Sequence, residues 1–128
     1  MKNILFVCIE NSCRSQMAEA FANMDGHEII KAYSAGSRPS GSVNPKAVAA
    51  MRDTGYDLSV HTSKGLDDIP DIEYDLVVTM GCGDACPYVR TRLRQDWDIP
   101  DPKTMNEKDF AEVRDMIRSK VRKLIESV

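Results

Sequence analysis

The stretch that decides the fold of this chain runs Ile4-Leu5-Phe6-Val7 and then Cys8-Ile9-Glu10-Asn11-Ser12-Cys13-Arg14-Ser15. The short apolar run predicts a buried strand, and Gln16 to Phe21 have the pattern of a helix start. A strand, a tight loop and a helix N-terminus together bind oxyanions, because backbone N–H groups converge in the loop and the helix end adds positive potential. A thiolate at Cys8 is stabilised by the same field.

Two side chains of this stretch, Cys8 and Arg14, supply a nucleophile and an anion clamp. Arg14 follows Cys8 after five intervening residues and can fork two donors onto a tetrahedral anion. Ser15 could donate a hydrogen bond to the thiolate. A buried structural cysteine is the alternative for Cys8. The oxyanion-binding groups are expected from Ile9, Glu10, Asn11, Ser12, Cys13, Arg14 and Ser15, and we call Cys8 to Ser15 the anion loop.

The length of 128 residues predicts a single domain, residues 1–128, that folds without a metal or disulfide staple. The net charge of −3 argues against general binding to nucleic acid or to an anionic membrane, so an anion site must be local. No apolar run approaches the ~20 residues of a membrane span. The N-terminus lacks the pattern of a signal peptide. We therefore expect a cytoplasmic protein, and a monomer.

The order of elements along the chain predicts the α/β class. Strands are expected at residues 3–7, 27–34, 76–80 and 94–97, and helices at 15–24, from Asn44-Pro45 onward, near 63–66 and at 107–128. The alternation, with a further helix expected between the last two strands, predicts a four-stranded parallel sheet, doubly wound, with helices on both faces. Ligands in such folds bind beyond the carboxyl ends of the strands, where Cys8 and Cys82 would meet.

The remaining cysteines allow several interpretations. Cys82 and Cys86 are separated by three residues in a glycine-rich loop, which suggests a dithiol that can close to a disulfide, or else two unrelated surface thiols. Cys13 is expected to pack beneath the anion loop, with a redox role as the alternative. All four cysteines could instead bind zinc, but the cationic Arg14 disfavours that site.

Asp101 lies in the proline-stiffened segment Ile99-Pro100-Asp101-Pro102, after the last expected strand. A rigid carboxyl there could reach the rim of the anion loop and act as general acid. The alternative is an aspartate that only forms the turn before a proline. Neither His27 nor His61 has partners at metal-ligand spacing, and Trp97 is expected in the core.

The residues from Cys8 to Glu19 resemble the thioredoxin-coupled arsenate reductases, which are relatives of the low-molecular-weight tyrosine phosphatases. The resemblance extends over the chain in blocks at residues 33–36, 43–47, 61–63, 75–80 and 101–102. The anion loop does not separate the two branches. Cys82 and Cys86 favour the reductases, as does Lys103, because many of the phosphatases carry tyrosine at that position.

The resemblance implies arsenate reduction for arsenic detoxification by a three-cysteine relay, with no bound cofactor. Cys8 would attack arsenate held by Arg14, and Asp101 would protonate the leaving oxygen. Cys82 and then Cys86 would carry the resulting disulfide outward, and reduced thioredoxin would reopen it. Weak phosphatase activity is expected as well, because arsenate and phosphate have nearly the same shape and charge.

Three departures from the family pattern stand out. Three residues separate Cys82 from Cys86, whereas the best-known relatives space these cysteines further apart. Many relatives have glycine where Glu10 stands, so its carboxylate must point away from the anion. Some relatives bind potassium beside the loop through residues matching Asn11, Glu19 and Ser34, together with an acidic residue. In this chain Lys64 occupies the position of that acidic residue. We expect no resident metal, and the Lys64 ammonium in place of the potassium ion.

Two other functions stay open at the level of sequence. A phosphatase would use Cys8, Arg14 and Asp101 on phosphotyrosine or small phosphate esters, with the cysteine pair protecting Cys8 from oxidation. A non-enzymatic oxyanion or redox sensor would bind the anion without turnover.

Overall fold

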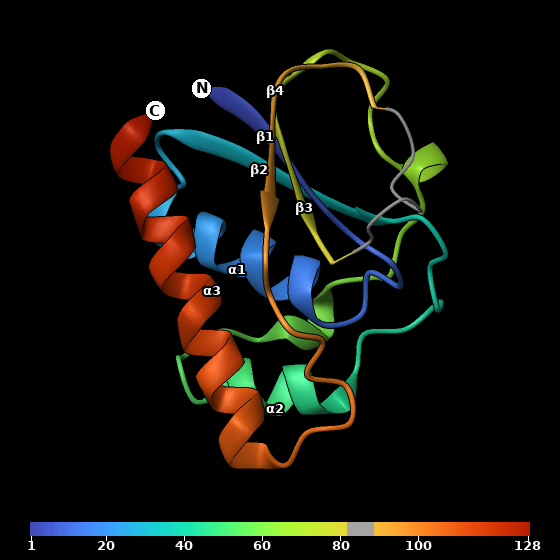
Figure 1. The fold of residues 1–128 in the computed structure, drawn as a ribbon, viewed down its shortest axis with the longest axis vertical. Coiled ribbons are helices and arrows are strands. Elements are labelled where there is room, and N and C mark those ends of the chain that lie inside the picture. Colours follow the sequence, from blue (N-terminus) through green and yellow to red (C-terminus); the bar gives the residue numbers. More distant parts are fainter. Residues whose placement is uncertain (82–88) are drawn as a thin grey trace.

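Four parallel strands form the central sheet of the computed structural model, which describes residues 1–81 and 89–128 (Figure 1). The spatial order is β2-β1-β3-β4, and all three strand pairings are parallel. This confirms the parallel sheet expected from the alternation of strands and helices. The bounds of the strands are β1 Lys2–Cys8, β2 Ile30–Gly36, β3 Tyr74–Met80 and β4 Thr91–Trp97.

The register of the sheet brings the carboxyl ends of three strands to one edge. Cys8 pairs with Gly36 of β2, and Val7 pairs with Thr79 of β3. The last residue of β1 therefore lies beside the ends of both neighbouring strands. This is the edge at which parallel α/β sheets bind ligands.

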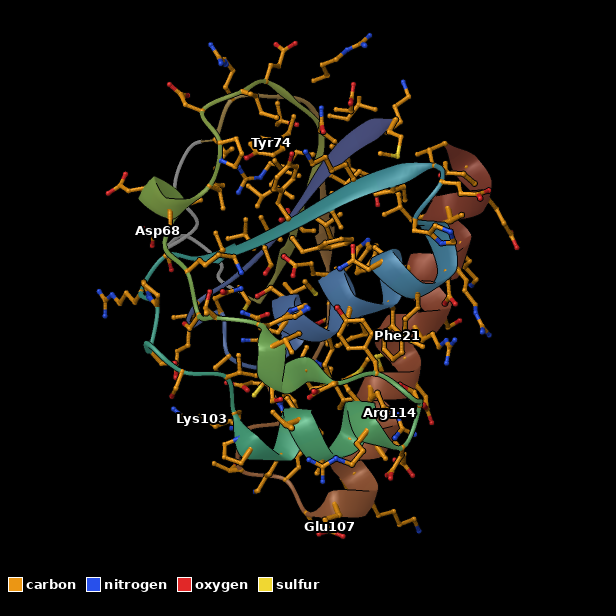
Figure 2. The ribbon with its side chains drawn as sticks, turned by 180° about the vertical axis from the view of Figure 1, so that it is seen from behind. Phe21, Asp68, Tyr74, Lys103, Glu107 and Arg114 are labelled. Carbon is orange, nitrogen blue, oxygen red and sulfur yellow. The ribbon has the colours of Figure 1, made fainter. Side chains whose placement is uncertain are left out.

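Three α-helices, α1 Arg14–Gly26, α2 Pro45–Arg52 and α3 Glu107–Ser127, share one large apolar core with one face of the sheet. Phe6 and Val78 enter this core from the sheet, and Figure 2 shows Phe21 of α1 among the helices. The other face is covered by a smaller cluster with a 3-10 helix, Leu66–Asp68, beside it. Helical cover is thus present on both faces, but unequally. The stripe expected on the last helix is buried at Phe110, Val113, Ile117, Val121 and Leu124.

Several expected boundaries were wrong by a few residues. Helix α1 continues to Gly26, two residues beyond Met24, and β2 starts at Ile30 rather than at His27. The start of β2 is set by pairing with β1, since Lys2 lies opposite Ile30. Strand β4 begins at Thr91, three residues before the expected start, although most of its residues are exposed.

The helix expected near residues 63–66 is replaced by two 3-10 helices, Leu58–Val60 and Leu66–Asp68. The residues between them are extended instead, because they hydrogen-bond to the anion loop and to Gly36. The helix expected between the last two strands falls largely on residues 82–88, outside the described residues. Within the described ranges, no helix combines the length and the apolar character that crossing a bilayer requires.

Candidate active site

The carbonyl oxygens of the anion loop are bound from outside the loop. Every carbonyl from Cys8 to Ser12 accepts a hydrogen bond of 2.8–3.2 Å. The donors, in order, are the N–H of Ser37, the N–H of Arg38, the N–H of Ser40 with the hydroxyl of Ser63, the side-chain amide of Gln16 and the N–H of Asn44. Because the acceptors of the loop are satisfied outside, its N–H groups are left for an anion inside.

The loop can lie this close to β2 only because residue 36 is glycine. A Cβ atom on Gly36 would lie 2.6 Å from the Ile9 carbonyl oxygen and 2.9 Å from the Asn11 nitrogen, closer than side-chain atoms come to a backbone. Any side chain there would push the anion loop off the sheet. Gly36 thus shapes the site without contacting a ligand.

Asn11 locks the loop from the inside. It is fully buried and has a φ of 51°, in the left-handed region that asparagine tolerates better than most residues. Its Oδ1 accepts from the backbone N–H of Lys64 at 2.7 Å. Since a backbone N–H can only donate, this contact fixes which way round the Asn11 amide lies, and its Nδ2 donates to Ser15 Oγ at 2.8 Å.

The direction of the hydrogen bond between Ser15 and Cys8 follows from this arrangement. Ser15 Oγ lies 2.9 Å from Cys8 Sγ and already accepts from Asn11. Its single hydrogen is therefore free to donate to sulfur, and a thiolate is the better acceptor. The structure thus brings together Cys8 and Ser15 as the sequence predicts, with Asn11 orienting the hydroxyl.

A polar network that sequence reasoning missed lies behind the loop. The Gln16 amide donates to Asn11 Oδ1 and to the Thr62 carbonyl, both at 2.8 Å. Its Oε1 therefore faces His61 Nδ1 at 2.9 Å, and the same nitrogen lies 3.0 Å from Glu19 Oε2. His61 Nδ1 must carry a proton to serve these two oxygens. The sequence signal for this network is weak, because its contacts join residues up to 46 positions apart.

Lys64 lies beside this network. Its Nζ donates to the Thr62 carbonyl at 3.0 Å and lies 3.9 Å from Glu19 Oε1. Of the three residues that the sequence matched to potassium ligands of some relatives, Glu19 is the one whose side chain faces this ammonium group. The buried hydroxyl of Ser34 has no hydrogen-bond partner among the described residues.

Arg14 is buried and reaches across the carboxyl end of the sheet. One of its terminal nitrogens donates to the Ile99 carbonyl at 3.1 Å, and the other lies 3.9 Å from Asp101 Oδ2. A Cβ atom on Gly81, whose φ is 73°, would overlap the Arg14 guanidinium. The first residue after β3 is therefore packed directly on the anion clamp.

The segment after β4 closes the other side of the site. Asp101 Oδ1 accepts from the backbone N–H of Lys103 at 3.1 Å, while the Lys103 ammonium lies 2.8 Å from Glu10 Oε2. The Glu10 carboxylate is thus turned toward a cation on the rim. The hydrogen bond to Glu10, together with its charge, raises the pKa of Lys103 above its ordinary value.

Cys13 lies beneath the loop in the apolar core. Burial raises the pKa of its thiol to about 11, and the charge of Asp101 adds to the effect. At neutral pH Cys13 is therefore a protonated thiol with little nucleophilic character. The expected packing role fits this position better than the redox alternative.

These groups enclose a small cavity of about 50 Å³, large enough for a few waters or one tetrahedral oxyanion. It opens at the N-terminus of α1, where the N-cap residue Cys13 makes no side-chain capping bond within the described structure. The orphan N–H groups of the first turn and the helix dipole both favour an anion here. The cavity is lined by Cys8, Ile9, Glu10, Ser12, Cys13, Arg14, Asp101 and Lys103.

Cys82 and Cys86, the further thiols of the relay expected from the sequence, lie outside the described residues. Among residues 1–81 and 89–128, no group of three or more histidine, cysteine, aspartate or glutamate side chains is arranged to hold a metal ion.

Comparison with known proteins shows which family has this architecture. The family model of the low molecular weight phosphotyrosine protein phosphatases matches residues 3–128. The chain belongs to this family. It is 37% identical to the glutaredoxin arsenate reductase of Synechocystis sp., over 100% of this chain and 99% of that protein.

Solved structures in the family are similar over the whole chain. One described as an arsenate reductase in the phosphate binding state superposes with a TM-score of 0.90 at 37% identity, covering 100% of this chain and 99% of that one. The thioredoxin-dependent arsenate reductase of Corynebacterium glutamicum has a TM-score of 0.80 at 28% identity, covering 99% of this chain and 61% of that one. Within the phosphatase family, the chain thus lies on the branch of the arsenate reductases.

Proposed function

We propose that this protein reduces arsenate to arsenite, with Cys8 as the nucleophile. The observation that carries the proposal is the Cys8–Ser15 contact of 2.9 Å at the base of a loop whose carbonyls are bound outside it. The choice of arsenate as the substrate rests on the arsenate reductases among its relatives. Phosphate and arsenate fit the same cradle of N–H groups, and the geometry of the loop suits both.

In the first step, the Cys8 thiolate attacks arsenic while Arg14 and the loop N–H groups bind the oxygens. Charge on those oxygens is stabilised by donors that are already in place, so little reorganisation is needed. Asp101 protonates the departing oxygen, which leaves as water. The product is a Cys8–arsenic(V) thioester-like adduct in which no electron has yet moved to arsenic.

Reduction requires a second thiol. The Cys82 thiolate attacks the Cys8 sulfur, the sulfur–arsenic bond breaks, and its electron pair stays on arsenic, which leaves as arsenite. Cys86 then attacks Cys82 and frees Cys8 as a thiolate. Two thiols are oxidised to one disulfide and arsenic gains two electrons. A phosphate ester has no such acceptor, so added cysteines turn the phosphatase loop toward redox chemistry.

The position of Gly81 supports Cys82 as the second thiol. Gly81 packs against the Arg14 guanidinium, and Cys82 is the next residue. The last described residue before the two cysteines therefore lies at the anion clamp.

We propose reduced thioredoxin as the electron donor for the Cys82–Cys86 disulfide. A structural neighbour is described as thioredoxin-dependent, and a curated relative carries glutaredoxin in its name. A built-in second and third thiol favours thioredoxin, because a dithiol reductant can attack a disulfide carried on the protein itself.

The test is NADPH consumption with arsenate, thioredoxin and thioredoxin reductase, comparing the intact protein with Cys86→Ser. Sustained consumption is expected for the intact protein, and at most one turnover for the variant. Parallel reactions with glutaredoxin and glutathione identify the donor. No arsenate-dependent consumption with either donor would overturn the proposal.

The second candidate is a phosphatase, favoured by the family match and by Arg14 and Asp101 facing Cys8 across one cavity. Steady cleavage of p-nitrophenyl phosphate that survives in Cys86→Ser, without arsenate turnover in the intact protein, would establish it instead.

A further inference from the structure

An ion pair crosses the mouth of the anion loop, and the proposed reaction does not use it. Lys103 Nζ lies 3.0 and 2.8 Å from the two carboxylate oxygens of Glu10. Glu10 stands in the loop two residues after Cys8, whereas Lys103 belongs to the segment that carries Asp101. The pair therefore joins the two sides of the cavity.

Both ends of this bridge are anchored. The backbone N–H of Lys103 donates to Asp101 Oδ1 at 3.1 Å, and the Lys103 carbonyl accepts from Lys46 Nζ at 3.4 Å. Figure 2 shows Lys103 on the connection before α3, beside the N-terminal end of α2. At the other end, the Glu10 carbonyl is bound by Ser63. The bridge thus spans two fixed pieces of backbone.

The bridge lies where the organic group of an ester would have to pass. In an in-line displacement, the leaving oxygen is opposite the attacking sulfur, on the side of the general acid. In the proposed reaction this acid is Asp101, and the cavity that holds its carboxyl is also lined by Glu10 and Lys103. Free arsenate or phosphate carries no group on that oxygen, whereas an ester carries its whole alkyl or aryl part there.

The charges of the pair also suit a free oxyanion. An unpaired Glu10 carboxylate at the mouth would repel a dianion, and pairing with Lys103 cancels most of that repulsion. The pair therefore adds little net charge at the rim of the cavity.

We propose that the Glu10–Lys103 pair is a selectivity bar, which favours free tetrahedral oxyanions over phosphate esters at the anion loop. The inference deepens the proposed function, since it rests on the anion loop being the site of arsenate and phosphate. An exposed ion pair contributes little to stability, so its removal leaves the fold intact.

The test compares binding of inorganic phosphate and of phenylphosphonate, by calorimetry on the reduced full chain. The decisive variant is the double substitution Glu10→Gln with Lys103→Met, which keeps the net charge and removes the bar. We expect the ratio of its phenylphosphonate affinity to its phosphate affinity to rise at least about tenfold over that of the intact protein.

The single variants separate the effect of charge on ligand affinity from the effect of steric access. Lys103→Met leaves an unpaired carboxylate and should weaken both ligands, whereas Glu10→Gln leaves an unpaired ammonium and should strengthen both. The charge-swapped variant, Glu10→Lys with Lys103→Glu, rebuilds the pair and should exclude phenylphosphonate again. Lys123→Met, which removes an exposed charge near the C-terminal end of α3, is the matched surface control.

An unchanged ratio of the two affinities in the double variant would overturn the proposal of a selectivity bar. So would the absence of phosphate binding by the intact protein at millimolar concentration, because the guarded loop would then not be an anion site. A changed ratio without arsenate-dependent NADPH consumption would sustain the bar and reject the proposed reductase.

Discussion

Ser15 shows how a single residue can determine the reactivity of another. Its hydroxyl has one hydrogen, and the amide of Asn11 occupies its acceptor side, so the hydrogen is directed to Cys8. The Lys64 backbone N–H fixes that amide in turn. A chain of three contacts, each with only one allowed direction, thus ends on the sulfur of the nucleophile.

Replacing Ser15 by alanine removes the donor and should slow alkylation of Cys8. Hydrogen bonds to charged groups contribute about 1.5–3 kcal/mol, so the rate with iodoacetamide at pH 7 should fall roughly tenfold to a hundredfold. Mass spectrometry of the Cys8 peptide measures the rate site by site. Ser12→Ala is the control, since that hydroxyl contacts Cys13. Equal rates in the two variants would contradict the role given to Ser15.

Gly81 is the second residue whose effect is local. An alanine there meets two penalties, a backbone at φ 73° and a clash with Arg14. Gly81→Ala should therefore weaken phosphate binding at least about tenfold, because the displaced guanidinium no longer forks onto the anion. Calorimetric titration with phosphate is the measurement.

Gly55→Ala provides the matched control for Gly81→Ala. Gly55 has a φ of 88°, but nothing lies within 4 Å of the position of its Cβ. Both variants should lose about 1–2 kcal/mol of stability from the backbone, and only Gly81→Ala should lose anion affinity. Comparable losses of affinity in both would show that strain alone is responsible.

At the scale of elements, the anion loop is held by the segments around it. The residues after β2 bind its carbonyls from one side, and the extended stretch before the 3-10 helix Leu66–Asp68 binds Asn11 and Glu10 from the other. Helix α1 contributes Gln16 and Glu19 from its buried first turns. The cradle is therefore formed by the anion loop and these three segments, and its network ends at Lys64.

We propose that the Lys64 ammonium serves in place of a potassium ion, since it faces the Glu19 carboxylate and the Thr62 carbonyl. Arsenate turnover should then be the same in 0.1 M KCl and 0.1 M NaCl, to within about twofold, since both salts screen charge alike. Lys64→Met should make turnover depend on potassium. Steep, potassium-specific activation of the intact protein would contradict the proposal.

At the scale of the whole molecule, arginines of α3 connect this helix to α1 and α2. Arg114 donates to the Ala50 carbonyl of α2, and Arg118 and Arg122 bind Asp25 at the end of α1 (Figure 2 labels Arg114). Partial burial pushes the pKa of Asp25 up, but the hydrogen bonds and charges of the two arginines outweigh it. They hold the pKa of this carboxyl below its ordinary value.

Asp25 should therefore stabilise the protein at neutral pH and lose that effect in acid. Because its pKa is lower in the folded state, the contribution is fully present above the unfolded value of about 3.9 and is lost as the pH falls below it. Asp25→Asn should cost about 1–2 kcal/mol at pH 7, and the difference from the intact protein should shrink toward pH 3.

Urea unfolding of both proteins at pH 7, 5, 4 and 3 measures this difference. Asp53→Asn, whose exposed carboxylate lies 3.9 Å from Arg114, removes the same charge and should change little. A difference between Asp25→Asn and the intact protein that is independent of pH would reject the ion-pair explanation.

The sequence by itself determined the class of fold and the identity of the loop. The apolar run before Cys8, the spacing to Arg14 and the stripe of the last helix are local periodicities, and local patterns survive in a sequence read alone. The same holds for the N-cap at Asn44, whose side chain accepts from the Lys46 N–H as expected.

Only the tertiary structure decided which contacts hold the anion loop and which ion pair lies at its rim. The contacts of Gln16 with His61, of Glu10 with Lys103 and of Gly81 with Arg14 join residues 45 to 93 positions apart. No local periodicity encodes such pairs, since they form when parallel strands bring distant chain segments to one edge. The sequence therefore determined which groups are present, and the folded sheet determined which of them meet.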